Sequence, residues 1–325
     1  MKYLLSTTAT ALAFAFAGPA LAADNWPSKT IQMVVPFPAG SSPDILARTL
    51  AEPMSKELGQ TIIVENKPGA GGNIGTRYGA QAKPDGYTLL MTINGPMVTA
   101  PTLYKKSLGY DPFTDLQPIS LVGTSPNVLI VPTESEATTL QEFIDLAKAE
   151  QGALNYGSVG AGSASHLSMA MLEHEADIEL AHIPYSGFQQ ILSGVISGDI
   201  DASFMVPGIA MPQVKSDKIR ALAVTSLSPS DLMPDLPTVA SKEGFEDFEA
   251  ISWNGLFVPA NTPEEIVVRL NTLVQEVLEQ PQTQEKIRAL YFTPKGSTPA
   301  ELTELMKTDK QRWDAVIERL GLNLD

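Results

Sequence analysis

The sequence predicts an α/β protein with two lobes that close like a clamshell, each lobe a mostly parallel sheet flanked by helices. Short apolar runs alternate along the chain with segments of helical periodicity, which is typical of parallel sheets covered on both faces. Several of these runs end in Gly- and Ser-rich turns, at the strand ends where α/β sheets bind ligands. Residues 121–126 and 223–228 follow or lie in strand-like runs and are rich in small residues, and we expect the chain to cross between the lobes there.

The expected elements alternate over most of the chain. Strands are expected at residues 31–37, 61–65, 88–92, 128–131, 154–157, 180–183, 202–205, 220–225 and 249–258. Helices are expected at residues 43–58, 74–82, 139–149, 163–173, 187–196, 209–216, 263–278, 281–290 and 299–320. The last three helices each begin at a proline, whose missing N–H costs nothing in a first turn.

Two chain crossings divide the sequence into lobes. We expect residues 23–123 and 227–325 to form lobe one, and residues 124–226 to form lobe two. Two crossings also make a hinge, and a ligand that contacts both lobes binds the closed form better than the open one.

Residues 1–22 have the features of a cleavable export signal. Lys2 precedes an apolar stretch at residues 9–17, and the Ala20-x-Ala22 pair fits signal peptidase cleavage before Ala23. The apolar stretch is too short for a permanent membrane-spanning helix. The sequence therefore predicts a periplasmic protein.

Composition excludes several classes of function. The 325-residue chain has no cysteine, so thiol catalysis and cysteine metal sites are excluded and the fold depends on its core rather than on disulfides. The formal net charge of −15 makes nucleic acid and anionic membrane surfaces poor partners. An acidic protein that binds an anion needs local donors, and backbone amides supply them without adding a charge that must be desolvated.

Two turns between a strand and a helix are candidates for an anion site. N–H groups at a helix start favour negative charge, and glycines let a ligand approach the backbone. The residues concerned are Ala39, Gly40, Ser41 and Ser42 in the first turn, and Ser158, Gly160, Ala161, Gly162 and Ser163 in the second. We expect the two turns to hold one carboxylate or phosphate between the lobes, and a branched side chain at Gly162 to block access to its N–H groups.

Other residues at strand ends are expected around this site. Asn94 and Tyr185 offer polar groups to a ligand. Three apolar residues are expected either to form walls of the site or to be ordinary core: Phe37, Phe204 and Met205.

Two residues are expected to support the turns from behind. Asp44 is expected mainly as an N-terminal capping carboxylate, with ordering of the loop before it as the functional alternative. His166 follows Ser163 by three residues, which favours a helix-packing or supporting role.

Three other chemistries fit the sequence poorly. The glycines of residues 69–75 are displaced from a dinucleotide fingerprint, so a structural turn is expected and no cofactor. His166, His174 and His182 have a spacing of eight, which does not suit zinc, so no metal is expected. There is no Gly-x-Ser-x-Gly elbow, but an exported serine esterase using Ser163 and His166 remains the alternative function.

A family resemblance covers essentially the whole chain after the signal. Its motifs are Val35-Pro36-Phe37-Pro38-Ala39-Gly40 with Asp44, Val64-Glu65-Asn66-Lys67-Pro68-Gly69-Ala70-Gly71-Gly72, Pro84-Asp85-Gly86-Tyr87-Thr88-Leu89-Leu90, Tyr156-Gly157-Ser158 with Gly160, Gly162-Ser163 and His166-Leu167, Pro184-Tyr185 with Gly187, Pro234-Asp235-Leu236-Pro237-Thr238, and Val258-Pro259-Ala260 with Thr262-Pro263. In order and spacing these motifs make the chain resemble the periplasmic solute receptors of tripartite tricarboxylate transporters, the Bug family.

The resemblance implies a non-enzymatic receptor with a periplasmic-binding-protein-like clamshell fold, and we expect a monomer. Such a receptor binds a small organic acid, which can be a dicarboxylate, a tricarboxylate or an aromatic acid, and delivers it to inner-membrane transporter subunits. The resemblance assigns the ligand carboxylate to the two turns and its distal end to the loops near Asn94, Tyr185 and residues 204–208. The family usually has glycine after Gly40, where this chain has Ser41, whose side chain is expected either to add a hydroxyl contact or to narrow the site.

Overall fold

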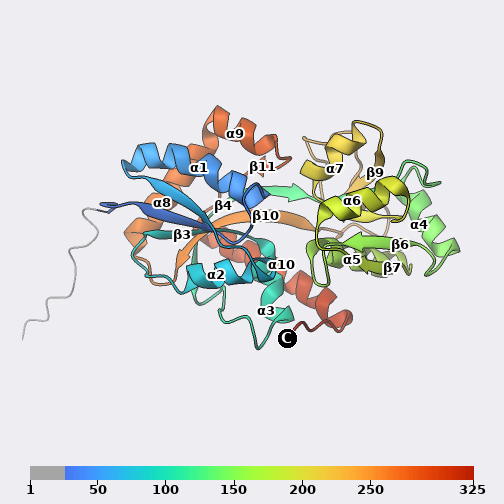
Figure 1. Ribbon diagram of the computed structural model, residues 1–325, viewed down its shortest axis with the longest axis horizontal. Coiled ribbons are helices and arrows are strands. Elements are labelled where there is room, and N and C mark those ends of the chain that lie inside the picture. The colour runs from blue at the N-terminus through green and yellow to red at the C-terminus, as the bar shows by residue number, and fades with distance from the viewer. Residues whose placement is uncertain (1–25) are drawn as a thin grey trace, which may run out of the picture.

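The computed structural model describes residues 26–325, so the expected signal segment and its cleavage site lie outside the described residues. Two groups of strands, each flanked by helices, lie at opposite ends of the long axis (Figure 1). Among residues 26–325, no helix is both long enough and apolar enough to cross a membrane.

The larger sheet has six strands in the order β11-β4-β10-β3-β1-β2. Its strands are β1 (Ile31–Val35), β2 (Ile62–Asn66), β3 (Thr88–Ile93), β4 (Leu116–Pro126), β10 (Ile251–Pro259) and β11 (Thr293–Pro294). The pairs β1–β2 and β1–β3 are parallel, whereas β10 runs antiparallel to both β3 and β4. We call this sheet, with the helices packed on it, unit one.

Unit two consists of a three-stranded sheet, β8-β5-β9, and a two-stranded sheet, β6-β7, with their helices. Its strands are β5 (Val128–Pro132), β6 (Asn155–Ser158), β7 (Ala181–Pro184), β8 (Ser203–Met205) and β9 (Ile219–Val224). A parallel bridge between Tyr156 and Ala202 joins the two sheets.

The strand registers bring the strand ends of both units to one junction. In unit one, Ile251 pairs with Pro126, so β4 ends where β10 begins, and β1 and β3 run in the same direction as β4. In unit two, Val128 at the start of β5 pairs with Met205 and Val224, so β8 and β9 end there. β6 runs parallel to β7, and a parallel bridge joins β6 to the residue before β8, so β6 and β7 end at the same edge of unit two as β8. Both edges therefore meet where the chain passes from Pro126 to Val128.

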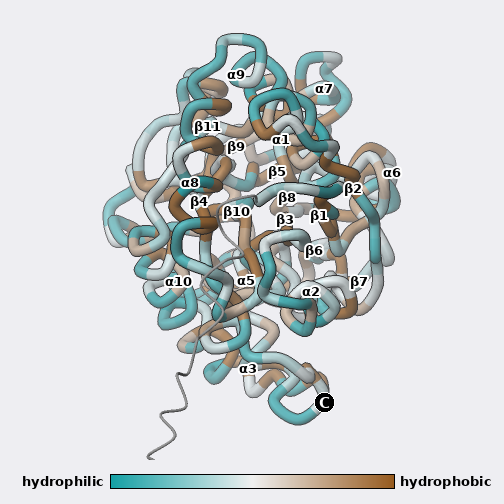
Figure 2. Tube along the Cα trace, turned by 90° about the vertical axis from the view of Figure 1, so that its left-hand side faces the viewer, coloured by the Kyte–Doolittle hydropathy of each residue, from teal (hydrophilic) through white to brown (hydrophobic). Residues whose placement is uncertain are grey.

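Helices cover the sheets and place the apolar residues inside. They are α1 (Ser42–Leu58), α2 (Asn73–Ala80), α3 (Ala100–Leu103), α4 (Leu140–Ala149), α5 (Ala164–Ala176), α6 (Phe188–Ser197), α7 (Pro207–Val214), α8 (Glu264–Glu279), α9 (Pro281–Arg288) and α10 (Pro299–Arg319). Short 3₁₀ helices form at η1 (Ala70–Gly72) and η3 (Val239–Ser241), and a short π-helix forms at η2 (Gly95–Thr99). On one face of the six-stranded sheet, Leu46 and Leu50 of α1 and Leu270 of α8 share a core with Met33 of β1. Hydrophobic segments concentrate at the strands in the centre, and hydrophilic ones on the outer helices (Figure 2).

A second core runs through both units. It contains Val34 and Leu90 of unit one, Leu129 and Phe204 of unit two, and Trp313 of α10. The helix α10 contacts β4 and η2 as well as α5, so it packs on both units. The two units therefore share apolar packing beside the chain crossings.

A cluster of buried hydrogen bonds joins the crossing segments. The Asn127 N–H donates to Thr225 Oγ1 at 2.8 Å, and Thr225 Oγ1 donates to the Ala250 carbonyl at 2.7 Å. The Asn127 side chain also donates to the Ala250 carbonyl, at 3.2 Å. All three residues are buried. The division of the chain into lobes at residues 124 and 227 stays a prediction.

The α/β class is confirmed, and every expected strand and helix is found with its ends within three residues of those expected. Some features were missed, among them the short elements α3 and β11. β4 is an 11-residue strand where a crossing alone was expected, because Pro118 and Gly123 interrupt its apolar pattern; its pairing with β10 has irregularities at Ile119 and Val122, next to these two residues. The sheets are also mixed rather than mostly parallel, because β10 returns antiparallel between β3 and β4.

Candidate ligand-binding site

The first turn, residues 36–42, connects β1 to α1 and is organised by Asp44. The buried Asp44 carboxylate accepts hydrogen bonds from the Gly40 N–H at 2.9 Å and from Asn66 Nδ2 at 2.9 Å, and it pairs with Arg48 at 2.9 Å. Asp44 thus orders the loop that precedes α1. The capping role expected first for Asp44 is wrong, because its carboxylate reaches outside the helix to Gly40, where φ is +82°.

Asp44 remains ionised although it is buried. Burial alone would raise the pKa of this carboxyl, but hydrogen bonds from Arg48, Gly40 and Asn66 and the charge of Arg48 lower it below its usual value. The Arg48 guanidinium also donates to Asn66 Oδ1 at 3.1 Å. The positive charge nearest this turn is therefore already neutralised by the protein.

Ser41 closes the first turn on itself. Its hydroxyl donates to the Pro38 carbonyl at 2.7 Å, and its N–H donates to the same oxygen at 3.2 Å. Its φ of −70° does not require glycine. Among the described residues, the N–H groups of Phe37, Ala39, Ser42 and Asp44 have no hydrogen-bond partner, and those of Ala39 and Ser42 belong to the exposed or half-buried part of this turn.

The second turn, residues 158–163, connects β6 to α5, and buried side chains engage two of its glycine amides. The Gly160 N–H donates to Ser158 Oγ at 3.1 Å, and the Gly162 N–H donates to His166 Nδ1 at 3.0 Å. Ser158 is fully buried and His166 is nearly so. The amides of both glycines therefore shape the turn instead of facing outward.

Two more serines complete this turn. The Val159 N–H donates to Ser165 Oγ at 3.2 Å, and Ser163 Oγ donates to the Gly160 carbonyl at 2.7 Å. Ser163 is also the N-cap of α5, since its Oγ accepts from the N–H of His166. Three N–H groups in this part of the described chain keep no partner: those of Ala161, Ala164 and Ser165.

Stacked rings support the second turn from behind. The His166 ring lies 4.3 Å from the His182 ring at 18°, and the Tyr156 ring lies 4.9 Å from His182 at 20°. Burial, with a contribution from His182, lowers the pKa of His166 to about 4, and burial also lowers the pKa of His182. His166 is therefore neutral near pH 7, and its Nδ1 is available as the acceptor for Gly162.

Gly162 faces unit one rather than open space. Its φ is +75°, and a Cβ at this position would lie 2.6 Å from Leu103 Cδ1 of α3 and 3.4 Å from Leu324 Cδ1. A side chain at Gly162 would thus displace the turn by collision with Leu103, which differs from the direct blocking expected. In contrast, nothing lies within 4 Å of a Cβ built on Gly160.

The other expected site residues divide into two groups. Asn94 is buried and its Nδ2 donates to the Ile251 carbonyl at 3.3 Å, while Phe37 and Tyr185 are half-buried at the same junction. Phe204 and Met205 are fully buried in apolar clusters, which fits the core interpretation of these two residues.

The pairing needed for a serine esterase is not formed. The Ser163 hydroxyl bonds to the backbone N–H of His166, whose ring Nδ1 is occupied by Gly162. Ser158 Oγ lies 2.6 Å from His182 Nε2, but Ser158 is fully buried, so a substrate cannot reach it. Residues 26–325 contain no group of three or more His, Asp or Glu side chains placed to hold a metal ion.

Sequence reasoning missed Ser165 and His182. Ser165 lies inside the expected helix, and no pattern marked its hydroxyl as an acceptor for the turn. His182 joins the site only because β7 pairs with β6, which places Tyr156 opposite His182.

Similarity to known proteins identifies the family. A model of the tripartite tricarboxylate transporter family receptors matches residues 46–322. The chain belongs to this family. BugT of Bordetella pertussis (strain Tohama I) is 32% identical over the whole chain and 99% of its own length. The family resemblance drawn from the sequence is confirmed.

Solved structures of similar receptors have the same fold. The periplasmic binding protein BugD is 35% identical, with a TM-score of 0.77 over 92% of this chain and 99% of its own. A Rhodopseudomonas palustris protein with adipate is 30% identical, with a TM-score of 0.81 over 92% and 99%. MatC from Rhodopseudomonas palustris, with bound malate, is 31% identical, with a TM-score of 0.77 over 90% and 100%. These neighbours confirm the two-lobed binding-protein fold.

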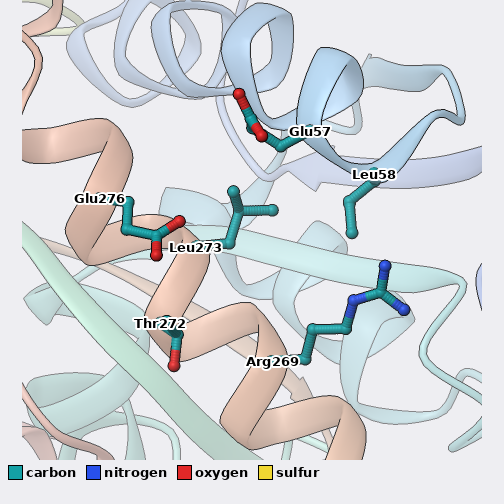
Figure 3. Close-up of a pocket in the computed structure, with 6 residues that line it drawn as sticks. All are labelled: Glu57, Leu58, Arg269, Thr272, Leu273 and Glu276. Carbon is teal, nitrogen blue, oxygen red and sulfur yellow. The ribbon is translucent and has the colours of Figure 1, made fainter.

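One hollow of the receptor lies far from the two turns. A cavity of about 360 Å³ opens between the end of α1 and the middle of α8 (Figure 3). Its lining residues are Glu57, Leu58, Arg269, Thr272, Leu273 and Glu276. Because α1 ends where β2 begins, this cavity lies at the opposite edge of the six-stranded sheet from the turns. Its two carboxylates also make it a poor site for an organic acid.

Proposed function

We propose that this protein is a periplasmic receptor that captures a small organic carboxylate between units one and two and delivers it to inner-membrane transporter subunits. One observation carries the proposal. Two strand-to-helix turns at the junction each leave N–H groups free at a helix start, while the rest of each turn is locked by the protein. The free donors are those of Ala39 and Ser42 in the first turn, and of Ala161, Ala164 and Ser165 in the second.

The number of free donors fits a carboxylate shared by both turns. A carboxylate accepts about four hydrogen bonds, whereas the amides of Ala39 and Ser42 supply two. The helix dipoles of α1 and α5 add favourable potential at both turns. Amide donors do not titrate near neutrality, so we expect the affinity for an acid with a pKa near 4 to be almost constant from about pH 6 to pH 8.

The ligand class follows from the family. Two similar receptors have adipate and malate in their solved structures, so dicarboxylates are the first ligands to test, followed by tricarboxylates and aromatic acids. Binding is proposed without catalysis, since Ser158 is buried and the His166 ring is engaged. A monomer is proposed, and its two units are expected to close on the ligand.

Calorimetric titration with adipate, malate, citrate and benzoate tests the proposal. Ala39 and Ala161 are exposed residues of the two turns, so a side chain can be added there without disturbing the core. We expect Ala39→Asp and Ala161→Asp each to weaken binding at least tenfold, about 1.4 kcal/mol, because the added carboxylate repels the ligand.

The neutral variants Ala39→Asn and Ala161→Asn are the matched controls, because an asparagine side chain has nearly the same shape as an aspartate side chain. They are expected to retain affinity within about threefold, less than 1 kcal/mol. Failure of the wild-type protein to bind any of these acids would refute the proposal. Equal affinities for the Asp and Asn variants would place the ligand elsewhere.

A further inference from the structure

Residues 320–325, which we call the strap, follow α10 and lie along α3 (Figure 1). The Leu324 N–H donates to the Leu103 carbonyl at 2.8 Å, at the last residue of α3. Leu324 also packs against the core that Leu103 shares with Leu167 of α5. The strap therefore joins the end of α10 to a helix of unit one, at the place where unit one meets the second turn.

Asp325 fastens the strap. Its carboxylate accepts from the Lys106 N–H at 2.9 Å, from the Ser107 N–H at 3.1 Å and from Ser107 Oγ at 3.0 Å. Desolvation acts to raise the pKa of this carboxyl, but the hydrogen bonds from Lys106 and Ser107 and the charge of Lys106 together lower it. Asp325 is thus ionised at neutral pH and holds Leu324 in position.

Leu103 and Leu324 together form the surface against which Gly162 lies. A Cβ on Gly162 would lie 2.6 Å and 3.3 Å from the two methyl groups of Leu103, and 3.4 Å from Leu324. Gly162 is the neighbour of Ala161, one of the free donors proposed to hold the ligand. Any movement of Gly162 relative to unit one therefore moves this donor relative to the first turn.

We infer that Leu103, Leu324 and Asp325 are positioning residues for ligand binding: they hold the second turn at the distance from the first turn that lets both turns reach one carboxylate. The inference rests on the proposed function. Holding a site in its bound geometry reduces the ordering cost of binding, so loss of this support raises the dissociation rate more than it lowers the association rate.

The first experiment compares the ligand binding of variants in the strap. Leu324→Ala and Asp325→Asn are expected to weaken the binding of the acid that the wild-type protein prefers by about tenfold, mainly through faster dissociation in stopped-flow measurements. The control is Leu320→Ala, since Leu320 is 39% exposed and belongs to the same strap. This control is expected to bind like the wild-type protein.

The outcomes separate the two proposals. If the wild-type protein binds no acid, the proposed function fails. If it binds and all three strap variants bind equally well, the proposed function stands and the positioning role is wrong. Equal increases in dissociation rate for Leu324→Ala and Leu320→Ala would also overturn the positioning role, because they would show that any truncation in the strap loosens the protein.

A double-mutant cycle tests the contact directly. Gly162→Ala is expected to weaken binding, partly by collision with Leu103 and partly by strain at φ +75°. Leu103→Ala removes the collision, so it is expected to restore binding about fivefold or more in the Gly162→Ala background. Gly160→Ala has strain at φ +105° but an open Cβ position, so Leu103→Ala is not expected to rescue it. Equal rescue of both glycine variants, or of neither, would contradict the inference.

Discussion

The two turns share one local plan, a strand end followed by a helix start, but different chemistry holds them. The first turn is organised by an ionised carboxylate, Asp44, with Arg48 as its counter-ion. The second is organised by neutral groups, among them Ser158 Oγ and His166 Nδ1. In both cases the side chain engages a glycine amide and leaves neighbouring amides free.

The turns also differ in where their support originates. Ala39 and Gly40 are exposed, and the contacts that hold the first turn come from unit one itself. The second turn is packed against residues of another unit, Leu103 and Leu324, through Gly162. The first turn is therefore shaped before the units meet, whereas the second depends on how the units meet. This difference predicts unequal responses of the turns to mutation and to pH.

The largest expected effect comes from removing the charge at the centre of the first turn. Asp44→Ala leaves the amide of Gly40 and the side chain of Asn66 without their acceptor, so we expect the free energy of unfolding to fall by about 3 kcal/mol and ligand affinity to fall more than tenfold. Urea unfolding and calorimetry measure both quantities.

Asp44→Asn keeps one acceptor oxygen, so it is expected to lose less stability and less ligand affinity than Asp44→Ala. The control is Glu52→Gln, on the same helix, which removes an exposed pair with Lys56 and is expected to leave the unfolding midpoint unchanged. If Asp44→Ala were as stable as the wild-type protein, the ionic account of the first turn would be wrong.

An intermediate effect is expected from acid, which acts on the second turn. The folded pKa of His166, about 4, lies below the ordinary 6.5, so between these values the unfolded state binds more protons than the folded state. The contribution of His166 to stability is therefore full above pH 6.5 and falls as pH decreases toward 4, by about 2 kcal/mol between pH 7 and pH 5. Asp309, whose pKa burial raises to about 6, contributes in the opposite direction in this range, so the comparison with a His166 variant isolates the histidine. The Asp44 pKa is lowered, so the first turn is unaffected in this range.

NMR titration of the His166 ring measures this pKa directly, and urea unfolding at pH 7 and pH 5 measures its effect. His166→Asn retains an acceptor near Nδ1 without a titrating ring, so it is expected to lose less stability in acid than the wild-type protein. His174→Asn, on an exposed residue of the same helix, is the control and should keep the wild-type pH dependence. A midpoint for His166 near pH 6.5 would contradict the neutral account of the second turn.

The smallest expected effect is at Ser41. Ser41→Gly removes one exposed hydrogen bond to Pro38 and frees the backbone, so we expect a loss of roughly 1 kcal/mol in stability and less than a twofold change in affinity. Ser41→Ala removes the hydroxyl alone and should lose about half as much. A large change in affinity would mean that the Ser41 hydroxyl contacts the ligand.

Most local elements of the fold could be predicted because their signals are short-range. Helix starts were marked by proline or serine, as at Pro299 and Ser163, and strands by short apolar runs. β4 was missed because Pro118 and Gly123 interrupt its pattern, and only the pairing with β10 shows that both residues belong to one strand, with irregularities at the neighbouring Ile119 and Val122. The helix α3 was missed as well, although it supplies Leu103.

The sequence by itself determined the class of the fold, the two turns and their bias toward anions, since strand propensity, glycine content and helix starts are local properties. Only the tertiary structure decided which amides remain free. The Gly162 amide could be assigned to the ligand or to His166 until the ring was placed. Pairing of β6 with β7 brought His182 behind that ring, and α3 and the strap brought Leu103 and Leu324 against Gly162. These contacts join residues far apart in the chain, and no local pattern encodes them.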